Sequence, residues 1–315
     1  MPIYENRKRN FINALHSGFD SVFDSFFFKL TISISEIIVN SCPICQTTSL
    51  IEKQYGTNKV LLCTYCDVHV LAEQPSKQNL DAYYTSSYAM SASEVLSSEH
   101  RRLFRLPEQF WLISELEKQG IHPGDSILDI GCDKGYFLDQ CRRFGYSVHG
   151  VEPSEQARQY CKSIGLNIES DISAIHDQCN AITLWHVLEH FTEPRALLGK
   201  AHSLLNPNGL LFIRVPDFSS FWSRLLRQYW IWFQPQNHYV HYSKHSIRKL
   251  VEAQGFDIIQ CISRKPNDGI THRAGIMADH TLKTHFSFAQ SFKKKLGRIY
   301  EHVTGIEIYL IARKR

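Results

Sequence analysis

Short apolar runs alternate with amphipathic stretches along the second half of the chain. The run 126–131, SILDIG, has the length and apolar character of a fully buried parallel strand. An amphipathic stretch follows it, and the next run ends in an acid at Glu152. The alternation then continues with a helix over 154–164, a buried strand at the start of 180–194 and a strand within 204–217. A helix and a strand follow within 241–264, and a last strand lies within 305–315. This order predicts an α/β fold with a parallel sheet, whose ligands lie at the carboxyl ends of the strands.

The turn after the first of these strands is rich in glycine and acidic residues. It reads Asp129-x-Gly131-x-Asp133-x-Gly135, with glycine where the backbone passes close to a ligand. Glu152 follows about 20 residues on, at the tip of the next strand, where a carboxylate can accept both hydroxyls of a ribose. The unit is therefore predicted to bind a nucleoside-bearing cofactor.

Two cofactors compete for this turn. A dinucleotide needs G-x-G-x-x-G, with its pyrophosphate at the helix N-terminus. Here those positions hold Gly131, Asp133 and Tyr136, and the Asp133 carboxylate would repel a pyrophosphate. S-adenosylmethionine has an amino group, a sulfonium and a ribose but no phosphate, so acidic residues suit it. The turn resembles the first motif, D/E-x-G-x-G-x-G, of class I S-adenosylmethionine-dependent methyltransferases. Asp133 replaces the middle glycine, and Asp tolerates left-handed backbone better than most residues.

Further strings extend this resemblance over about residues 40–315. WHVLEH, NPNGLLFIRVP and a histidine-containing segment before a helix resemble, as an ordered set, a subgroup that includes sugar C-methyltransferases and quinone-type O-methyltransferases. The resemblance implies a Rossmann-like, seven-stranded, mostly parallel sheet with helices on both faces. Asp171 would lie near the adenine, or would serve as a helix N-cap. The residues implied to bind S-adenosylmethionine are Asp129, Gly131, Asp133, Gly135, Glu152, Asp171, Trp185 and His186.

A second motif lies far upstream. Cys42-Pro-Ile-Cys45 and Cys63-Thr-Tyr-Cys66 form two C-x₂-C pairs with 17 residues between them. Four thiolates on two tight turns satisfy tetrahedral zinc and leave no position open, so the spacing predicts a structural zinc in a small zinc-ribbon-like module. The alternatives are a degenerate site, a redox dithiol, or His69 as a replacement ligand. The five other cysteines of the nine are scattered, which favours a reducing, cytoplasmic location over a disulfide framework.

Histidines mark the predicted acceptor side of the site. Methyl transfer to a hydroxyl or a carbon acid needs a base, and histidine suits that near neutral pH. His186 follows the strand in 180–194, His190 lies one turn further on, and His238 stands in QPQNHYVHYS. By resemblance to the sugar C-methyltransferases, His190 and His238 flank the substrate, with His238 as general base and His190 as second choice. Those enzymes have a glutamate where this chain has Asn237, and hydrogen-bonded packing is the alternative role for each histidine.

Two other features leave alternatives open. His186-Val-Leu-Glu189-His190 matches the H-x-x-E-H zinc-peptidase motif, but its first histidine directly follows a buried run. Whether Glu189 and His190 bind a divalent metal stays open. In the resembling subgroup, a tyrosine-rich segment after the zinc module helps to cover the active site. Tyr84 and Tyr88 are therefore lid candidates, with Tyr88 also a catalytic candidate; ordinary aromatic packing is the alternative.

Charge and hydropathy limit other classes of function. The net charge of +4 is too modest to require a nucleic-acid partner. Segment 17–39 is apolar but is interrupted by Asp20, Asp24, Lys29 and Glu36, so no membrane span is expected there. It also lacks the pattern of a signal peptide. The segment is a candidate amphipathic helix that docks on the protein, on a partner or on a membrane surface.

The expected organisation is an N-terminal extension over 1–40, a zinc module over 41–75, a helical linker or lid over 76–120 and a methyltransferase domain over 121–315. The expected activity is methyl transfer from S-adenosylmethionine to a small molecule, a sugar nucleotide or a glycolipid precursor, at O, N or C. One alternative is an RNA methyltransferase, which would have a basic stripe from the module to the active site. The other is a non-catalytic interaction protein that keeps the fold without binding the cofactor.

Overall fold

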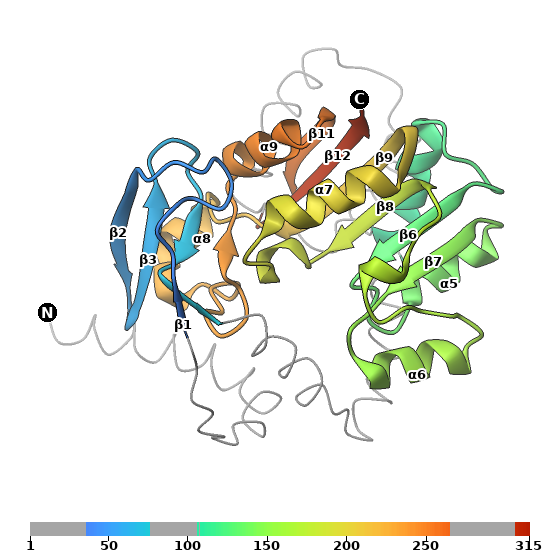
Figure 1. Cartoon of the computed structure of the whole chain (residues 1–315), viewed down its shortest axis with the longest axis horizontal. Helices are drawn as coiled ribbons and strands as arrows, with labels where there is room; N and C mark the ends of the chain where they lie inside the picture. The colour runs from blue at the N-terminus through green and yellow to red at the C-terminus, as the bar shows by residue number, and fades with distance from the viewer. Residues whose placement is uncertain (1–35, 76–105, 107, 265–305) are drawn as a thin grey trace, which may run out of the picture. The chain divides into compact units, whose positions relative to one another are not determined.

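The computed structural model describes residues 36–75, 106, 108–264 and 306–315 (Figure 1). The lid candidates Tyr84 and Tyr88 and most of the N-terminal extension lie outside these residues. Among the described helices, none combines the length and the apolar character that a membrane crossing needs.

The strands of the central sheet are β6 (Ser126–Ile130), β7 (Ser147–Val151), β8 (Cys179–Trp185), β9 (Leu205–Pro216), β11 (Phe256–Arg264) and β12 (Glu307–Lys314). Their order in the sheet is β11-β12-β9-β8-β6-β7 (Figure 1). β6 pairs in parallel with β7 and β8, and β8 pairs in parallel with β9. β12 runs antiparallel between β9 and β11. The mostly parallel α/β sheet that the sequence predicts is confirmed.

Among the described residues the central sheet has six strands, one fewer than the seven that the resemblance implied. The segment that would add a seventh strand beside β7 makes a single bridge, between Glu169 and Val151. Around that bridge, Glu169 N–H donates to the carbonyl of Gly150 at 3.0 Å. Leu166 and Ile168 of the same segment pack into a small apolar cluster with Cys132 and Leu138, whereas Asn167 and Ser170 are exposed.

The helices are α5 (Tyr136–Arg143), α6 (Glu155–Ser163), α7 (Pro194–Leu204), α8 (Phe221–Leu226) and α9 (Lys244–Ala253), with 3₁₀ turns η1 (Ile172–Ala174), η2 (Leu188–His190) and η3 (Arg227–Tyr229). Residues 108–118 are also helical. Helices cover both faces of the sheet, as expected. Leu128 and Leu184 belong to the core that includes α7 and α9, whereas Ile127 and Phe212 pack with α5 and with helix 108–118.

The cysteine motifs flank a second sheet, which is formed by β2 (Leu50–Tyr55), β3 (Asn58–Cys63) and β4 (His69–Leu71). The first motif precedes β2, and the second spans the end of β3 and the turn before β4. A distant segment, β10 (Val240–His241), adds to β4, which gives the order β10-β4-β3-β2. β1 (Glu36–Ile38) and β5 (Glu73–Pro75) form a separate pair. The side chain of Arg195 on α7 donates to the carbonyl of Ile44 at 2.9 Å, and the module shares one apolar core with the central sheet.

Candidate functional site

The glycine turn predicted from the sequence connects β6 to α5. Gly131, Asp133 and Gly135 have φ angles of 72°, 47° and 67°, all in the left-handed region. A Cβ atom on Gly131 would lie 2.5 Å from Cγ2 of Val187, so both the backbone and the space require glycine there. Asp133 adopts the left-handed conformation without being glycine, as Asp does more readily than most residues. The Asp at the middle glycine position is therefore compatible with the turn.

Glu152 closes this turn from the tip of β7. Its Oε2 accepts a hydrogen bond from Asp133 N–H and its Oε1 accepts one from Ser154 N–H, both at 2.9 Å. Burial raises the pKa of the Glu152 carboxyl despite these two donors. Each oxygen keeps a second lone pair that ribose hydroxyls can use. Oδ1 of Asp133 is buried and has no hydrogen-bond partner among the described residues, so a ligand that carries donors fits the turn.

Asp129 and Asp171 have partners within the protein. Asp129 is 2% exposed and accepts a hydrogen bond from Thr183 Oγ1 at 2.6 Å. Burial raises the pKa of this carboxyl to about 7. Asp171 is the N-cap of η1, where its side chain accepts from Ser173 N–H at 2.8 Å. The N-cap alternative for Asp171 is therefore realised, and its contact with adenine stays a prediction.

Trp185 and His186 lie at the end of β8. The Trp185 ring packs on Phe212, with centroids 4.9 Å apart. His186 has Nδ1 3.1 Å from Oε1 of Glu189 and Nε2 3.3 Å from Oε1 of Glu307. Burial alone would lower the pKa of His186, but the two carboxylates outweigh it and raise the pKa. The structure gives His186 an ion-pair role, and its contact with the cofactor stays a prediction.

The remainder of this ion-pair chain was missed in the sequence. Arg214 has Nη1 2.6 Å from Oε2 of Glu108 and Nη2 2.5 Å from Oε2 of Glu307. All three side chains are buried. The sequence pattern could have indicated two of these residues. Arg214 and Glu307 are charged residues within apolar runs that are predicted strands, and a buried charge requires a partner. The alternating series of charges runs from Glu108 through Arg214, Glu307 and His186 to Glu189.

Glu189, His190 and His238 meet at the end of this series. One potential ligand atom from each lies within 4.8 Å of the others, and the two imidazole centroids are 4.8 Å apart. Burial lowers the pKa of His238 to about 4. Burial would raise the pKa of Glu189, but the hydrogen bond from His186 and the nearby imidazoles hold it at about 2. The structure thus brings His190 and His238 together, as the resemblance implied, and adds a buried carboxylate.

The H-x-x-E-H string does not form a peptidase site. In that motif both histidines lie one turn apart on one α-helix. Here His186 follows β8 with a φ of 53°, and Glu189 and His190 lie on the short turn η2. The His186 ring is held between Glu189 and Glu307.

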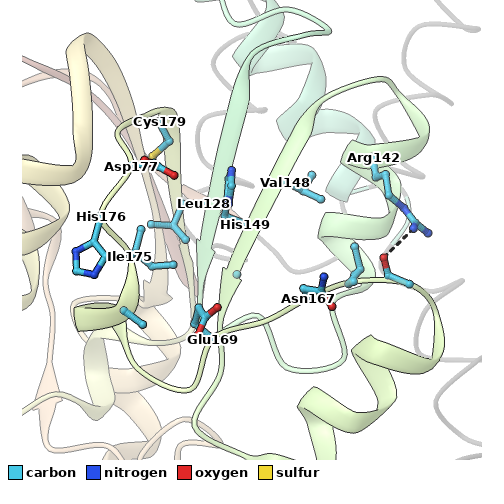
Figure 2. Close-up of a pocket in the computed structure, with 14 residues that line it drawn as sticks. Leu128, Arg142, Val148, His149, Asn167, Glu169, Ile175, His176, Asp177 and Cys179 are labelled. Carbon is cyan, nitrogen blue, oxygen red and sulfur yellow. Dashed lines mark hydrogen bonds between the residues drawn. The ribbon is translucent and has the colours of Figure 1, made fainter.

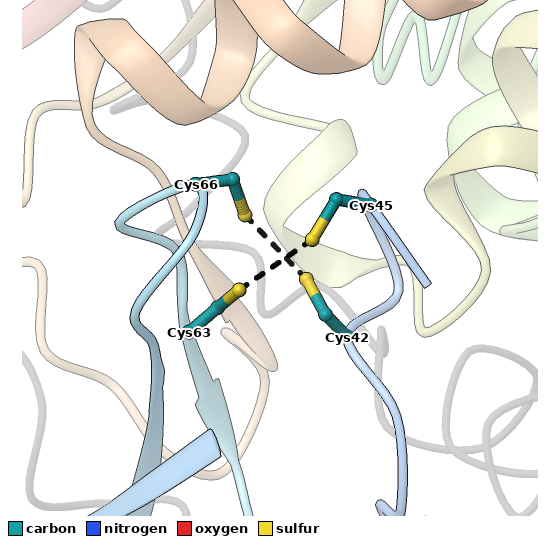
Figure 3. A group of neighbouring side chains, drawn as sticks. All are labelled: Cys42, Cys45, Cys63 and Cys66. Carbon is teal, nitrogen blue, oxygen red and sulfur yellow. Dashed lines mark hydrogen bonds between the residues drawn. The ribbon is translucent and has the colours of Figure 1, made fainter. Parts of the chain in front are cut away.

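The four cysteines of the N-terminal motifs face one another, as Figure 3 shows. The sulfur atoms are 3.5 Å apart in the pairs Cys42–Cys66 and Cys45–Cys63, and all four lie within 4.8 Å of one another. A tetrahedron of Zn–S bonds of about 2.3 Å places its sulfur atoms about 3.8 Å apart. The arrangement therefore fits a four-thiolate zinc site.

The two cysteine pairs have the same local backbone. Gln46 and Asp67, each directly after the second cysteine of its pair, have φ angles of 62° and 64°. His69, the alternative ligand, is not a member of this cluster. Its ring packs on Phe218 with centroids 4.8 Å apart.

A pocket of about 440 Å³ lies beside the middle of β6 and β7 (Figure 2). Leu128, His149 and Cys179 line it from the sheet, and Glu169 and His176 line it from the segment that leads into β8. The predicted cofactor residues do not line this pocket. Cofactor binding at the glycine turn and Glu152, at the carboxyl ends of the strands, stays a prediction.

Residues 96–261 match the family described as "Methyltransferase domain". The match spans more than half of the chain, and the chain belongs to this family. The methyltransferase class that the glycine turn and the later strings indicated is confirmed.

Curated relatives align over shorter segments. The chain is 33% identical over 104 residues to a ubiquinone biosynthesis O-methyltransferase of Actinobacillus pleuropneumoniae serotype 5b, which covers 28% of the chain and 44% of the relative. It is 27% identical over 152 residues to the protein of the same name from Salmonella arizonae, covering 44% of the chain and 62% of the relative. The chain thus spans less than two thirds of the length of these relatives.

Solved structures are similar at lower identity. The magnesium protoporphyrin IX methyltransferase from Synechocystis PCC 6803 with bound SAH gives a TM-score of 0.49 at 15% identity, covering 76% of the chain and 100% of that structure. The complex between the Haloferax volcanii Trm112 methyltransferase activator and the putative methyltransferase gives a TM-score of 0.49 at 14% identity, covering 74% and 96%.

Proposed function

We propose that the chain transfers a methyl group from S-adenosylmethionine to a small-molecule or sugar acceptor, glycolipid precursors included. The observation that carries this proposal is the closure of the glycine turn onto Glu152, at the carboxyl ends of β6 and β7, in a chain of the methyltransferase domain family. The names of the curated relatives support a small-molecule acceptor. When bound, S-adenosylmethionine supplies a methyl group on a sulfonium, which is activated for in-line displacement.

The residues around the turn would contact different parts of the cofactor. Glu152 accepts hydrogen bonds from the ribose hydroxyls with the lone pairs that Asp133 N–H and Ser154 N–H leave. Oδ1 of Asp133 accepts from a donor of the methionine portion. His190 and His238, beyond the end of β8, are the candidates for proton removal from the acceptor, at a site where methyl and acceptor are held in line.

The four cysteines are assigned a structural zinc. The distances between their sulfur atoms support this assignment, and a closed set of four thiolates leaves no position for a substrate. The ion would hold together the two cysteine turns and the strands β2 and β3.

The test is calorimetric titration of the purified, zinc-loaded chain with S-adenosylhomocysteine. Wild type should bind at micromolar concentration, and Glu152→Ala should lose binding at least tenfold. Glu193→Ala, an exposed carboxylate that makes no capping hydrogen bond at the start of α7, is the matched control and should bind as wild type. A folded wild type that does not bind would overturn the proposal in favour of the interaction-protein alternative. Acceptor screening with sugar nucleotides, lipid intermediates and RNA then separates the small-molecule activity from the RNA alternative.

A further inference from the structure

We propose that Glu189, His190 and His238 bind a divalent transition-metal ion, distinct from the ion assigned to the four cysteines. One potential ligand atom from each of the three residues lies within 4.8 Å of the others. They come from two segments far apart in sequence, since Glu189 and His190 lie on η2 and His238 precedes β10. Two imidazoles and one carboxylate are a frequent donor set for Zn²⁺, Fe²⁺ and Mn²⁺.

The histidine rings are oriented as metal ligands usually are. Nδ1 of His190 lies 2.7 Å from the carbonyl oxygen of Asn237, and Nδ1 of His238 lies 2.9 Å from the carbonyl oxygen of Trp232. A carbonyl can only accept, so each Nδ1 carries the proton and donates it. Nε2 of each ring therefore has the lone pair. A backbone carbonyl on the other ring nitrogen is the arrangement that fixes the tautomer and the orientation of a ligating histidine.

The carboxylate completes the set. Glu189 is 1% exposed, and its Oε1 is hydrogen-bonded to Nδ1 of His186 at 3.1 Å. Its Oε2 is buried and has no hydrogen-bond partner among the described residues. A buried carboxylate oxygen without a partner is costly, and a cation between Oε2 and the two Nε2 atoms would remove that cost.

The ion-pair chain behind Glu189 holds the carboxylate in place. His186 lies between Glu189 and Glu307, and Glu307 is fixed by Arg214 at 2.5 Å. Ligating carboxylates are commonly held by such hydrogen-bonded partners. An ordinary buried packing carboxylate would be expected to have both oxygens hydrogen-bonded, whereas Oε2 of Glu189 has no partner within the part of the chain that the structure describes.

Three protein ligands leave positions for an exogenous oxygen. We assign one of these positions to the acceptor hydroxyl, an assignment that rests on the proposed methyltransferase function. The ion would lower the pKa of the bound hydroxyl, which would then lose its proton to water. The oxygen then forms a bond to the methyl carbon, the C–S bond breaks, and its electron pair goes to sulfur, which leaves as the neutral thioether. The acceptor is thus a hydroxyl compound. In this arrangement His190 and His238 are metal ligands, and the ion instead of a free imidazole base promotes loss of the hydroxyl proton.

Metal stoichiometry with Co²⁺ as the probe tests the site without an activity assay. The full chain is stripped with a chelator, loaded with excess Co²⁺ and desalted, and its cobalt is measured together with its absorption spectrum. Wild type should hold two equivalents, one with the thiolate-to-cobalt charge-transfer band of the cysteine site and one with only weak ligand-field bands. Glu189→Gln, nearly isosteric, and His238→Ala should each lose the second equivalent and keep the charge-transfer band. His245→Ala, an exposed histidine on α9, should keep both.

One equivalent in wild type, carrying the charge-transfer band, would overturn the proposal. A second equivalent that Glu189→Gln retains would overturn it as well, because that ion would lie elsewhere. If His238→Ala does not fold, Glu189→Gln still decides. Titration with S-adenosylhomocysteine on the same preparations separates the two proposals. Two equivalents of cobalt without cofactor binding would leave the metal site standing and reject the methyltransferase proposal.

Discussion

The backbone N–H of Tyr239 donates to the carbonyl oxygen of Glu189 at 2.9 Å. On its other side, the carbonyl of Tyr239 accepts from the N–H of Leu71 on β4 at 3.0 Å. Tyr242, three residues on, donates its hydroxyl to the carbonyl of Leu188. The segment that carries His238 is therefore held between the cysteine module and η2, so the module helps to define the candidate site from 100 or more residues away in sequence.

Loss of zinc should therefore disturb the histidine cluster as well as the module. Cys63→Ser removes one thiolate, and structural zinc contributes about 10–16 kcal/mol to folding in zinc-finger peptides. We expect zinc to be lost, with faster hydrogen exchange in β2 and β3 and also in 238–242. Mass spectrometry of exchanged peptides measures both regions. Cys261→Ser, on β11 away from the cluster, is the control and should leave both unchanged. Unchanged exchange over 238–242 in a zinc-free Cys63→Ser protein would contradict the relationship.

Asp129 should make stability depend on pH. Its pKa is raised by burial to about 7, compared with about 3.9 in an unfolded chain. Between these pH values Asp129 binds more protons in the folded chain than in the unfolded chain. Its contribution to stability is therefore fully present below about pH 4 and is lost as pH rises towards 7, by up to about 1.4 kcal/mol per pH unit.

Urea unfolding from pH 4.5 to 7.5 measures this dependence. Asp129→Asn keeps an oxygen for the hydrogen bond from Thr183 Oγ1 and cannot ionise, so the decline should be smaller in the variant. Asp257→Asn, whose side chain is 73% exposed, is the control and should keep the wild-type slope. Equal slopes in wild type and Asp129→Asn would show that Asp129 does not titrate as expected.

Local patterns in the sequence predicted most of the fold and part of the site. The glycine turn, Glu152 and the cysteine pairs were found because each depends on residues close in sequence or at a fixed spacing. The addition of β10 to β4 was not foreseen, because it joins Val240 to Val70 and no local pattern encodes such a pairing. The ion-pair chain depends in the same way on the distant Glu307.

Gly131 should be intolerant of a side chain. Its φ of 72° disfavours any other residue, and a Cβ would approach Cγ2 of Val187 to 2.5 Å. Gly131→Ala should lose about 2–4 kcal/mol of stability, as the sum of backbone strain and overpacking, and should weaken binding of S-adenosylhomocysteine. Gly120→Ala isolates the backbone part, because Gly120 has a φ of 92° and nothing within 4 Å of a Cβ. It should lose only about 1–2 kcal/mol in denaturant unfolding. Equal losses for the two variants would show that Val187 does not confine the turn.

Arg214 should be essential to stability because it is the cation between two buried carboxylates. Arg214→Met keeps much of the side-chain volume but leaves Glu108 and Glu307 without their shared partner. Removal of one member of a buried ion pair costs about 3–5 kcal/mol, and denaturant unfolding should show a loss of this size. Arg248→Met is the matched control, since Arg248 pairs with Glu252 at 3.8 Å with side chains 45% and 49% exposed. Such a pair is worth about 0–1 kcal/mol.

Arg214→Met should also disorder Glu189 through His186, so that Co²⁺ binding by Glu189, His190 and His238 weakens in any folded Arg214→Met protein. A folded variant with wild-type stability and two equivalents of cobalt would show that the ion-pair chain does not position the carboxylate.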